Sequence, residues 1–264
     1  MGHGFEQRKK VILDTLEREG SLLVKEFAAR LGISETTVRR DLNELDSLGV
    51  LKQVYGGAVR LEQGPTGLNL PVSQRSTRAI EAKRLVGKAA ADLVHDNDIL
   101  YIDPGTTSWE MIPYLKAKRN LTIISNSVRL LQCLDYIGHH NIIQLGGTLR
   151  TDRLDTVGTL SQLCIEQLRG YKAFQGGDGI DIEFGLSAVD HESALIAKII
   201  LANAKETCIL ADHTKFENPS MLYKITDIEH MDYLITDRPL SPAWDATCSQ
   251  AGVTVIVAQP ENTE

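Results

Sequence analysis

Apolar side chains recur at helical spacing in the first part of the chain. Residues 7–19 and 24–31 each carry apolar positions three or four residues apart, and a glycine, Gly20 or Gly32, follows each segment. Glycine often follows the last turn of a helix because it adopts a left-handed conformation without strain. The pattern therefore predicts two short helices that end in tight turns.

A third helix is expected after Ser34, whose hydroxyl can cap it. Its apolar stripe is Val38, Leu42 and Leu45, at positions i, i+4 and i+7. With that stripe buried, most of the short hydroxyls and long cations between these positions face outward: Thr36, Thr37, Arg39 and Arg40. Two helices joined by a glycine turn are typical of the helix-turn-helix motif, whose second helix enters the major groove of DNA. In that groove threonine methyl groups contact thymine, and arginine binds guanine.

Residues 49–59 alternate between apolar and polar positions and turn on a Gly-Gly pair, as a small β-wing does. Lys52, Gln53 and Tyr55 would then reach phosphates beside the groove. The predicted DNA-binding residues are Ser34, Thr36, Thr37, Arg39, Arg40, Lys52, Gln53 and Tyr55.

Beyond this module the pattern changes. Residues 61–72 contain two glycines and two prolines without periodicity, which predicts a linker. Further on, helices are expected over 77–94, with Lys83 and Lys88 on the polar side, and over 108–115, and strands over 98–102, 121–125 and 141–145. Alternating strands and helices favour a mainly parallel sheet with helices on both faces, a three-layer α/β fold. We therefore expect two domains, residues 6–60 and 73–258.

The charge distribution supports two modules. The chain of 264 residues has a net charge of −7. Residues 1–60 hold ten basic and nine acidic side chains, and the remainder holds 18 basic and 26 acidic ones. Such asymmetry suggests modules with different partners. Because the first module is nearly neutral, the prediction of DNA binding rests on the residue pattern.

Other classes of protein are disfavoured. The sequence has no run of about 18 apolar residues, and its N-terminus lacks the apolar segment of a secretory signal. The four cysteines are far apart without a C-x-x-C pair, and the histidines lack metal-ligand spacing. We therefore expect a cytoplasmic protein with reduced thiols, no metal, no cofactor and no membrane partner.

Several expected strands of the second module end in small, polar or glycine residues. These loops are 103–107 (DPGTT), 125–127 (SNS), 146–148 (GGT), 176–181 (GGDGID) and 211–216 (ADHTKF). Ligands of open α/β sheets bind just beyond the carboxyl ends of the strands. Backbone N–H groups of small residues, with the hydroxyls of Thr106 and Thr107, suit an anion such as phosphate.

The first module resembles, nearly position for position, the N-terminal domain of the DeoR family of bacterial transcription regulators. The resemblance spans residues 6–60 and is carried by Ser34, Thr37, Val38, Arg39, Arg40, Asp41, Leu42 and the closing Gly56-Gly57-Ala58. Residues 75–256 resemble the family's C-terminal effector domain, which is similar in fold to ribose-5-phosphate isomerase. This implies a phosphorylated sugar or a related metabolite as the effector.

Family motifs are matched at Asp103, Gly105, Thr106 and Thr107, at Asn126, at Gly146 and Gly147, at Asp178 and Gly179, and at 212–216. The resemblance implies that Gly105, Thr106, Thr107 and Lys83 hold the phosphate, and that Asp103, Asn126, Asp178 and Lys215 contact hydroxyls. The full set of expected effector-binding residues is Lys83, Asp103, Gly105, Thr106, Thr107, Ser125, Asn126, Ser127, Gly146, Gly147, Asp178, Gly179 and Lys215. Two positions depart from the family pattern, Pro104 and the run Phe174-Gln175-Gly176.

An active isomerase is the first alternative. Asp178 and Asp181 resemble the isomerase aspartates, and Glu192 could act as the base. However, residues 182–197 contain no lysine to stabilise the developing negative charge. A second alternative is an adaptor whose winged helix binds protein.

We expect a repressor of a carbohydrate-metabolism operon, without catalytic residues, that binds operator DNA as a homodimer or homotetramer. A sugar phosphate would release it from the operator or modulate it there.

Overall fold

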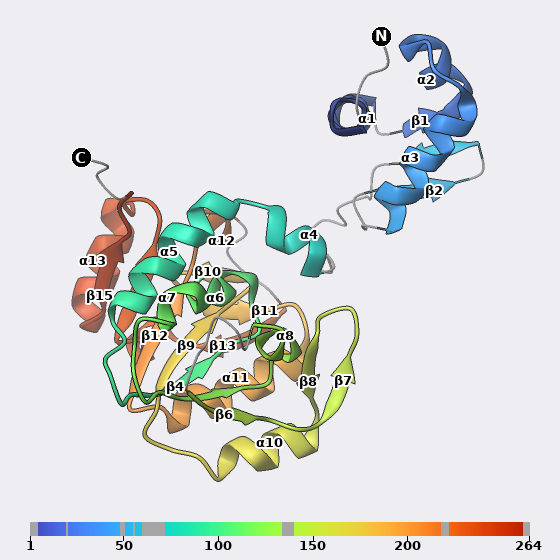
Figure 1. Cartoon of the computed structure of the whole chain (residues 1–264). Coiled ribbons are helices and arrows are strands. Elements are labelled where there is room, and N and C mark those ends of the chain that lie inside the picture. Colours follow the sequence, from blue (N-terminus) through green and yellow to red (C-terminus); the bar gives the residue numbers. More distant parts are fainter. Residues whose placement is uncertain are drawn as a thin grey trace. The chain divides into compact units, whose positions relative to one another are not determined.

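The computed structural model describes residues 5–19, 21–47, 51–54, 56–59, 72–133, 140–217 and 222–260. The chain divides into two compact units, Met1–Arg75 and Ser76–Glu264 (Figure 1). Residues 61–71 of the expected linker lie outside the described residues, and Val72 already begins a helix. The limits of the expected domains therefore stay a prediction.

The N-terminal unit is a winged helix-turn-helix. Its elements are α1 (Phe5–Glu19), β1 (Ser21–Leu23), α2 (Val24–Leu31), α3 (Glu35–Ser47), β2 (Lys52–Val54) and β3 (Gly57–Val59). The strands form an antiparallel sheet in the order β1-β3-β2. Gly32 ends α2 in the left-handed conformation, with a φ of 64°. The three predicted helices and the wing are confirmed, and β1 is an element that the sequence pattern did not predict.

The close pairing of β1 with β3 explains one glycine of the wing. Gly57 lies against β1, where a Cβ atom would collide with the carbonyl oxygen of Leu22. The core beneath the wing contains Ile12 of α1, Phe27 of α2 and Leu42 of α3, all buried. Each helix therefore contributes its apolar stripe to one core.

The C-terminal unit is built on seven parallel strands in the order β15-β14-β12-β9-β4-β5-β6. The strands are β4 (Ile99–Ile102), β5 (Thr122–Ser125), β6 (Asn141–Gln144), β9 (Lys172–Gly176), β12 (Glu206–Leu210), β14 (Tyr233–Thr236) and β15 (Thr254–Val257). From β4 the chain adds strands toward β6, and from β9 it adds strands toward β15. The order reverses between β4 and β9, and we call the carboxyl ends of these two strands the switch point.

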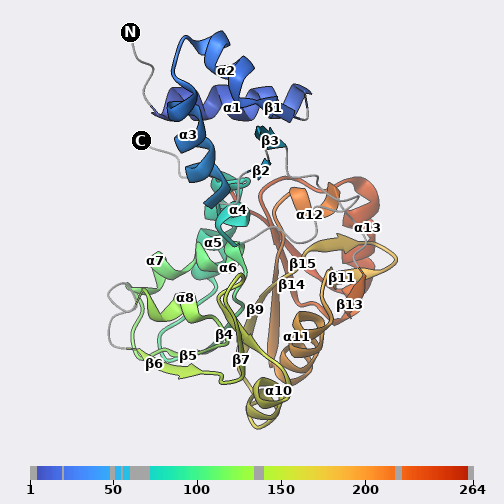
Figure 2. The same ribbon diagram turned by 90° about the vertical axis from the view of Figure 1, so that its right-hand side faces the viewer.

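Helices cover both faces of this sheet (Figure 2). On one face lie α5 (Ile80–Asp92), α6 (Thr106–Trp109), α7 (Ile112–Leu115) and α8 (Val128–Leu131). On the other lie α10 (Thr159–Glu166), α11 (His191–Asn203), α13 (Pro242–Ala251) and the antiparallel strands β10 (Gly179–Asp181), β11 (Gly185–Ala188) and β13 (Tyr223–Thr226). The hairpin β7 (Thr148–Arg150) and β8 (Asp155–Val157), the helix α12 (Thr214–Glu217) and the 3₁₀ turn η1 (Ile228–His230) complete the unit. The helix α4 (Val72–Thr77) contains the boundary between the two units. The predicted three-layer α/β fold is confirmed.

Two expected helices are divided in the structure. The prediction of one helix over 77–94 is wrong at its start. Ala79 is left-handed, with a φ of 50°, and separates α4 from α5. The helix over 108–115 is two short helices, α6 and α7. A Cβ atom on Gly87 would lie 2.6 Å from the Glu110 carbonyl carbon, so α5 crosses the chain closely at this break.

The expected exposure of Lys83 is also wrong. Lys83 is 3% exposed and lies on the buried side of α5, with Val86 and Ala90. Burial raises the pKa of Glu110 overall. The cation of Lys83 acts in the opposite direction and lowers this pKa, so the two side chains interact. Within the described ranges, no helix is both long enough and apolar enough to cross a bilayer.

Candidate DNA interface and effector site

The cap and the buried stripe of α3 are as predicted. The Ser34 hydroxyl accepts a hydrogen bond from the Thr37 backbone N–H at 3.2 Å and also bonds the Thr37 hydroxyl at 2.8 Å. Val38, Leu42 and Leu45 are fully buried. The orientation of α3 is therefore fixed by its apolar side.

The outer face of α3 carries the side chains expected to contact DNA. Thr36, Arg39 and Arg40 are exposed, and Thr37 is half-buried. The guanidinium of Arg39 lies 3.6 Å from the Glu35 carboxylate, a contact between two half-exposed side chains that binds weakly. Asn43 is exposed too, and its spacing from Thr36 and Arg40 places it on the same face. The same spacing in the sequence would have indicated Asn43.

A buried ion pair holds α1 against α3. The Nε and Nη2 atoms of Arg8 lie 2.6 and 3.0 Å from the two carboxylate oxygens of Asp41, which is 2% exposed. The hydrogen bond to Asp41 raises the pKa of Arg8. Asp41 belongs to the run of residues that resembles the DeoR family, and the structure gives it an internal role. The sequence does not indicate this pairing, because the partners are 33 positions apart.

The expected wing contacts are only partly described. Lys52 and Gln53 lie on β2, opposite Val59 and Ala58 of β3. Tyr55 and the side chains of Lys52 and Gln53 lie outside the described residues. Their contact with phosphates stays a prediction.

In the C-terminal unit, Asp103 ties together the two sides of the switch point. It follows β4, and its Oδ2 atom accepts hydrogen bonds from the Gly105 N–H at 3.0 Å, the Ser108 hydroxyl at 3.1 Å and the Gly176 N–H at 3.1 Å. A Cβ atom on Gly176 would approach this oxygen to 2.9 Å, so a glycine fits there. Asp103 therefore positions the loop 103–107 against the end of β9.

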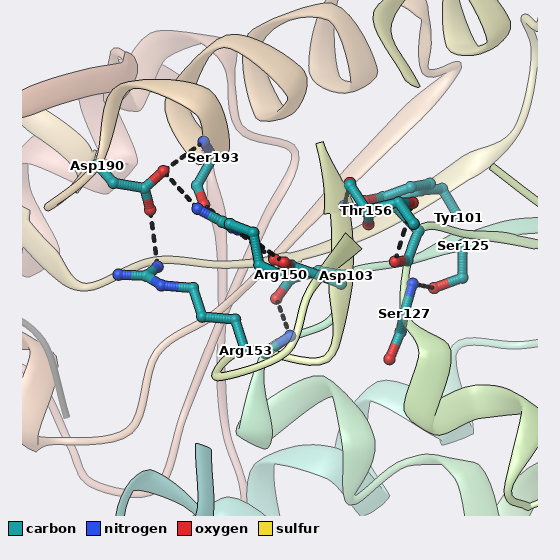
Figure 3. Close-up of polar contacts among 12 residues, drawn as sticks. Tyr101, Asp103, Ser125, Ser127, Arg150, Arg153, Thr156, Asp190 and Ser193 are labelled. Carbon is teal, nitrogen blue, oxygen red and sulfur yellow. Dashed lines mark hydrogen bonds and ion pairs between the residues drawn. The ribbon is translucent and has the colours of Figure 1, made fainter. Parts of the chain in front are cut away.

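The serine that ends β5 and the one that follows two residues later lie beside this loop (Figure 3). Ser125 donates to the Ile102 carbonyl at 2.6 Å and accepts from the Ser127 N–H at 3.0 Å. The Ser127 hydroxyl is buried, and among the described residues it has no hydrogen-bond partner. It is thus available to a bound molecule.

Asn126, by contrast, is engaged by the protein. Its amide oxygen accepts from the Tyr101 hydroxyl at 2.7 Å, and its amide nitrogen donates to the Thr156 carbonyl at 2.9 Å. Burial raises the pKa of Tyr101, so the phenol stays a neutral donor. Asn126 joins β4, β5 and β8.

The glycine pair after β6 packs against α10. The Ser161 hydroxyl donates to the Gly146 carbonyl oxygen. Gly147 has a φ of 143°, and a Cβ atom there would collide with Ser161 and would lie 2.6 Å from the Val157 carbonyl oxygen. A close approach of loop and helix therefore explains this pair.

The remaining candidates lie on several loops. Thr106 and Thr107 are buried in α6, and the Thr107 hydroxyl lies 3.5 Å from the carboxylate of Asp212, which is fully buried. Asp178 accepts from the Val189 N–H at 3.0 Å, and Gly179 begins β10. Lys215 lies half-buried on α12. The structure brings together the loops after β4, β5 and β9, and it connects the DHTKF segment to α6 through Thr107.

A network of four charged side chains lies close to these loops, and sequence analysis did not single it out (Figure 3). Arg150 binds both carboxylate oxygens of Asp155, at 2.8 and 2.6 Å, and one oxygen of Asp190 at 2.8 Å. Arg153 binds the other oxygen of Asp190 at 2.7 Å. Arg150 also donates to the Ser193 hydroxyl at 2.8 Å. Two cations and two anions balance, so the network joins the β7–β8 hairpin to α11 without net charge.

The two central members of this network, Arg150 and Asp190, are held in their charged forms. Burial lowers the pKa of Arg150, but the hydrogen bonds to Asp155 and the two carboxylates outweigh it and raise the pKa overall. Burial raises the pKa of Asp190, but hydrogen bonds from Ser193 and the charges of Arg153 and Arg150 lower it overall. Arg150 and Asp190 therefore stay ionised at neutral pH.

The described residues offer no second site for a phosphate or a metal. A cavity of about 490 Å³ lies between the β10–β11 turn, η1 and α13, and Glu183, Asp227 and Glu229 line part of it. That acidic lining does not suit a phosphate. In the described part of the chain, no three His, Cys, Asp or Glu side chains are grouped as metal ligands would be.

A family model for the DeoR-like helix-turn-helix domain matches residues 8–64, and one for the DeoR C-terminal sensor domain matches residues 78–238. The transcriptional repressor GlcR of Bacillus subtilis is 30% identical over 262 residues, with 97% of each chain covered. The transcriptional regulator IolR of the same organism is 28% identical, covering 90% of this chain and 94% of the relative.

A protein described as a putative aga operon transcriptional repressor, from Escherichia coli O157:H7, is 27% identical, covering 96% of this chain and 94% of the relative. Among solved structures, ribose 5-phosphate isomerase A of Methanocaldococcus jannaschii is 19% identical, covers 52% of this chain and 54% of that one, and has a TM-score of 0.38. A likeness of that degree assigns no function.

Proposed function

The chain belongs to the DeoR family of transcriptional regulators, and on that premise we propose that it represses genes of carbohydrate metabolism and is released from its operator by a phosphorylated sugar. Relatives named as repressors support the sign of this regulation. Such a protein acts where the DNA is, in the cytoplasm.

The observation that carries the DNA-binding role is the outer face of α3. Thr36, Arg39 and Arg40 are exposed beside a fully buried apolar stripe, so the helix can enter a groove without unfolding. We assign base contacts to these residues and to Thr37, and contacts with phosphates to Lys52, Gln53 and Tyr55 of the wing. Ser34 holds the start of the helix and lies near the backbone of the DNA.

One such module contacts few base pairs, so we propose that the protein binds as a homodimer or homotetramer on paired half-sites. The effector must favour one arrangement of the modules over the other, because a ligand with equal affinity for both shifts nothing. Residues 61–72 are where we expect the change in orientation to be absorbed.

We place the effector at the switch point, as expected for an open α/β sheet. The loop of Gly105, Thr106 and Thr107 would bind the phosphate, with the buried cation of Lys83 contributing positive potential. The remaining contacts would come from Asp103 of the same loop and from the other loops: Ser125, Asn126, Ser127, Gly146, Gly147, Asp178, Gly179 and Lys215. The unpartnered hydroxyl of Ser127 supports this placement.

We do not propose isomerase activity. Asp181 accepts hydrogen bonds from the N–H groups of Glu183 and Phe184, both at 2.8 Å, so it holds a turn. The segment 182–197 has no lysine that could stabilise an enediolate.

A binding experiment tests the proposal. The full chain is mixed with genomic fragments in a gel-shift assay, and the bound fragments are then titrated with a panel of sugar phosphates. We expect one set of fragments to bind and one sugar phosphate to release them. Turnover of any pentose or hexose phosphate would favour the isomerase instead, and failure to bind any fragment would favour a protein-binding adaptor.

A further inference from the structure

Gln175 lies at the switch point with its side chain buried. It is 5% exposed and is the fourth residue of β9. The pairing of β4 with β9 ends at Ile102 and Phe174, so the next residues in register are Asp103 and Gln175. The Asp103 N–H continues this ladder by donating to the Phe174 carbonyl at 3.0 Å. Gln175 is therefore the strand neighbour of the residue that organises the loop 103–107.

The orientation of the Gln175 amide is fixed by one hydrogen bond. Its Nε2 atom donates to the Gly176 carbonyl oxygen at 2.9 Å. The flipped amide would place two acceptor oxygens against each other, which is unfavourable. The Oε1 atom must therefore point the other way.

That oxygen is an acceptor without a donor. Oε1 of Gln175 is buried, and no donor among the described residues lies within hydrogen-bonding distance of it. A buried acceptor without a partner costs stability, so such atoms are rare in folded proteins. A ligand that donates a hydrogen bond would remove this cost.

The neighbouring elements indicate the chemistry of that ligand. Residues alternate along β9, so Gln175 faces the same side as Ala173, toward the layer that contains α11. In the first turn of α11, the Oε2 atom of Glu192 is a second buried acceptor without a partner in the described part of the chain. Acceptors of this kind bind hydroxyl groups, so the sheet end suits a polyol.

We propose that Gln175 is a specificity-determining residue of the effector site, and that its Oε1 atom accepts a hydrogen bond from one hydroxyl of a phosphorylated polyol. This inference rests on the proposed function. A buried acceptor discriminates strongly against an analogue that lacks the hydroxyl, because binding that analogue leaves the acceptor unsatisfied. Gln175 therefore selects the effector by its hydroxyl pattern, while the loop 103–107 selects it by its phosphate.

The chain offers a matched control. Gln144 ends β6, donates through Nε2 to the carbonyl of the next residue, Leu145, at 3.3 Å, and also has a buried Oε1 without a partner in the described ranges. It lies on the edge strand, separated from β4 by β5. Gln144→Leu therefore makes the same chemical change away from the switch point.

The experiment is calorimetric titration of the full chain and of Gln175→Leu, Gln175→Met and Gln144→Leu. The probes are D-ribose 5-phosphate, D-glucose 6-phosphate, D-fructose 1-phosphate, D-fructose 6-phosphate and inorganic phosphate. Each single-deoxy analogue of the sugar phosphate that binds most tightly completes the set. Melting temperatures without ligand show whether each variant folds, and Gln175→Met keeps the length of the side chain if Gln175→Leu does not fold.

We expect both Gln175 variants to bind the tightest sugar phosphate about tenfold more weakly. One deoxy analogue should lose the same factor with the wild type and nothing further with the variants. Inorganic phosphate should bind all proteins equally, and Gln144→Leu should behave as the wild type. Unchanged affinity and ranking in the Gln175 variants would overturn this inference and leave the proposed function standing. If the wild type bound no sugar phosphate, the proposed function would fall, and this inference with it.

Discussion

The two units of the chain use arginine in opposite ways. Arg39 and Arg40 of α3 are exposed, and Glu35 meets one of them only at 3.6 Å. Arg150 and Arg153 of the C-terminal unit are largely buried and bind the carboxylates of two aspartates at 2.6 to 2.8 Å. The charges of the first pair are open to solvent, and those of the second pair are neutralised by carboxylates inside the protein.

This contrast shows why counting basic residues does not locate a binding surface. An exposed cation is hydrated and can exchange water and counterions for a phosphate or a base with a small desolvation penalty. A buried cation has already lost its water, so its aspartate partners are needed to offset desolvation. Arg8 follows the second pattern inside the DNA-binding unit itself, since it pairs with the buried Asp41. The role of an arginine is therefore decided by what lies opposite it.

The largest effect is expected from Arg150→Ala. The change leaves Asp155 buried without its cation, which should lower the free energy of unfolding by about 3–5 kcal/mol. Both tryptophans, Trp109 and Trp244, lie in the C-terminal unit, so urea unfolding followed by tryptophan fluorescence reports on this unit. Arg119→Ala is the control, because Arg119 pairs with Asp96 on the surface and should leave the transition in place. Equal midpoints for the two variants would contradict a structural role for the network.

Next in size is the effect of Arg39→Ala on DNA binding. We expect a loss of about 1–3 kcal/mol of specific binding and a relaxed preference at one base pair, with no change in stability. Fluorescence anisotropy with a selected operator measures the affinity, and repeating it over a series of salt concentrations measures how the affinity depends on salt. Binding should weaken steeply with salt, because phosphate contacts release counterions. Unchanged operator affinity would count against the docking of α3 in the groove.

The difference between exposed side chains and buried ion pairs also explains what could be predicted from the sequence. The helices of the N-terminal unit follow from local spacing, and Val38, Leu42 and Leu45 identify the buried side of α3 directly. Its exposed side follows by exclusion. The Arg8–Asp41 pair could not be predicted, because neither residue differs in the sequence from a solvated charge.

In the C-terminal unit, the sequence located the loops but not the function of each residue in them. Asp103 was expected to contact a hydroxyl, yet three donors from the protein meet one of its oxygens. The sequence pattern places Lys83 on a polar side because it is a cation among apolar residues, yet it is buried. The break of the helix at Ala79 has no sequence signature either. The contacts of Asp103 depend on the pairing of β4 with β9, which residue spacing does not reveal.

A smaller effect is expected at the start of α3. Ser34→Ala removes the acceptor of the Thr37 N–H and should lower the stability of the N-terminal unit by about 1 kcal/mol. Calorimetry measures this effect as a shift in the unfolding transition of the N-terminal unit, which has no tryptophan and is therefore not reported by tryptophan fluorescence. Thr36→Ala is the matched control, since Thr36 is exposed on the same helix and alanine has the higher helix propensity. An equal loss of stability in Thr36→Ala would mean that the Ser34 cap does not stabilise the helix.

The smallest effect concerns acid, because the pKa of Asp190 reflects opposing causes. Burial raises this pKa, and hydrogen bonds from Ser193 with the charges of Arg153 and Arg150 lower it further than burial raises it. Since the folded pKa lies below the unfolded one, the charged form stabilises the protein above pH of about 4. This contribution is lost as the pH falls through the folded pKa.

In Asp190→Asn the cap of α11 persists without the charge, so the fluorescence-detected urea midpoint should start lower at pH 7. It should also fall less between pH 5 and 3 than in the wild type. Parallel curves would show that the charge of Asp190 does not contribute to stability.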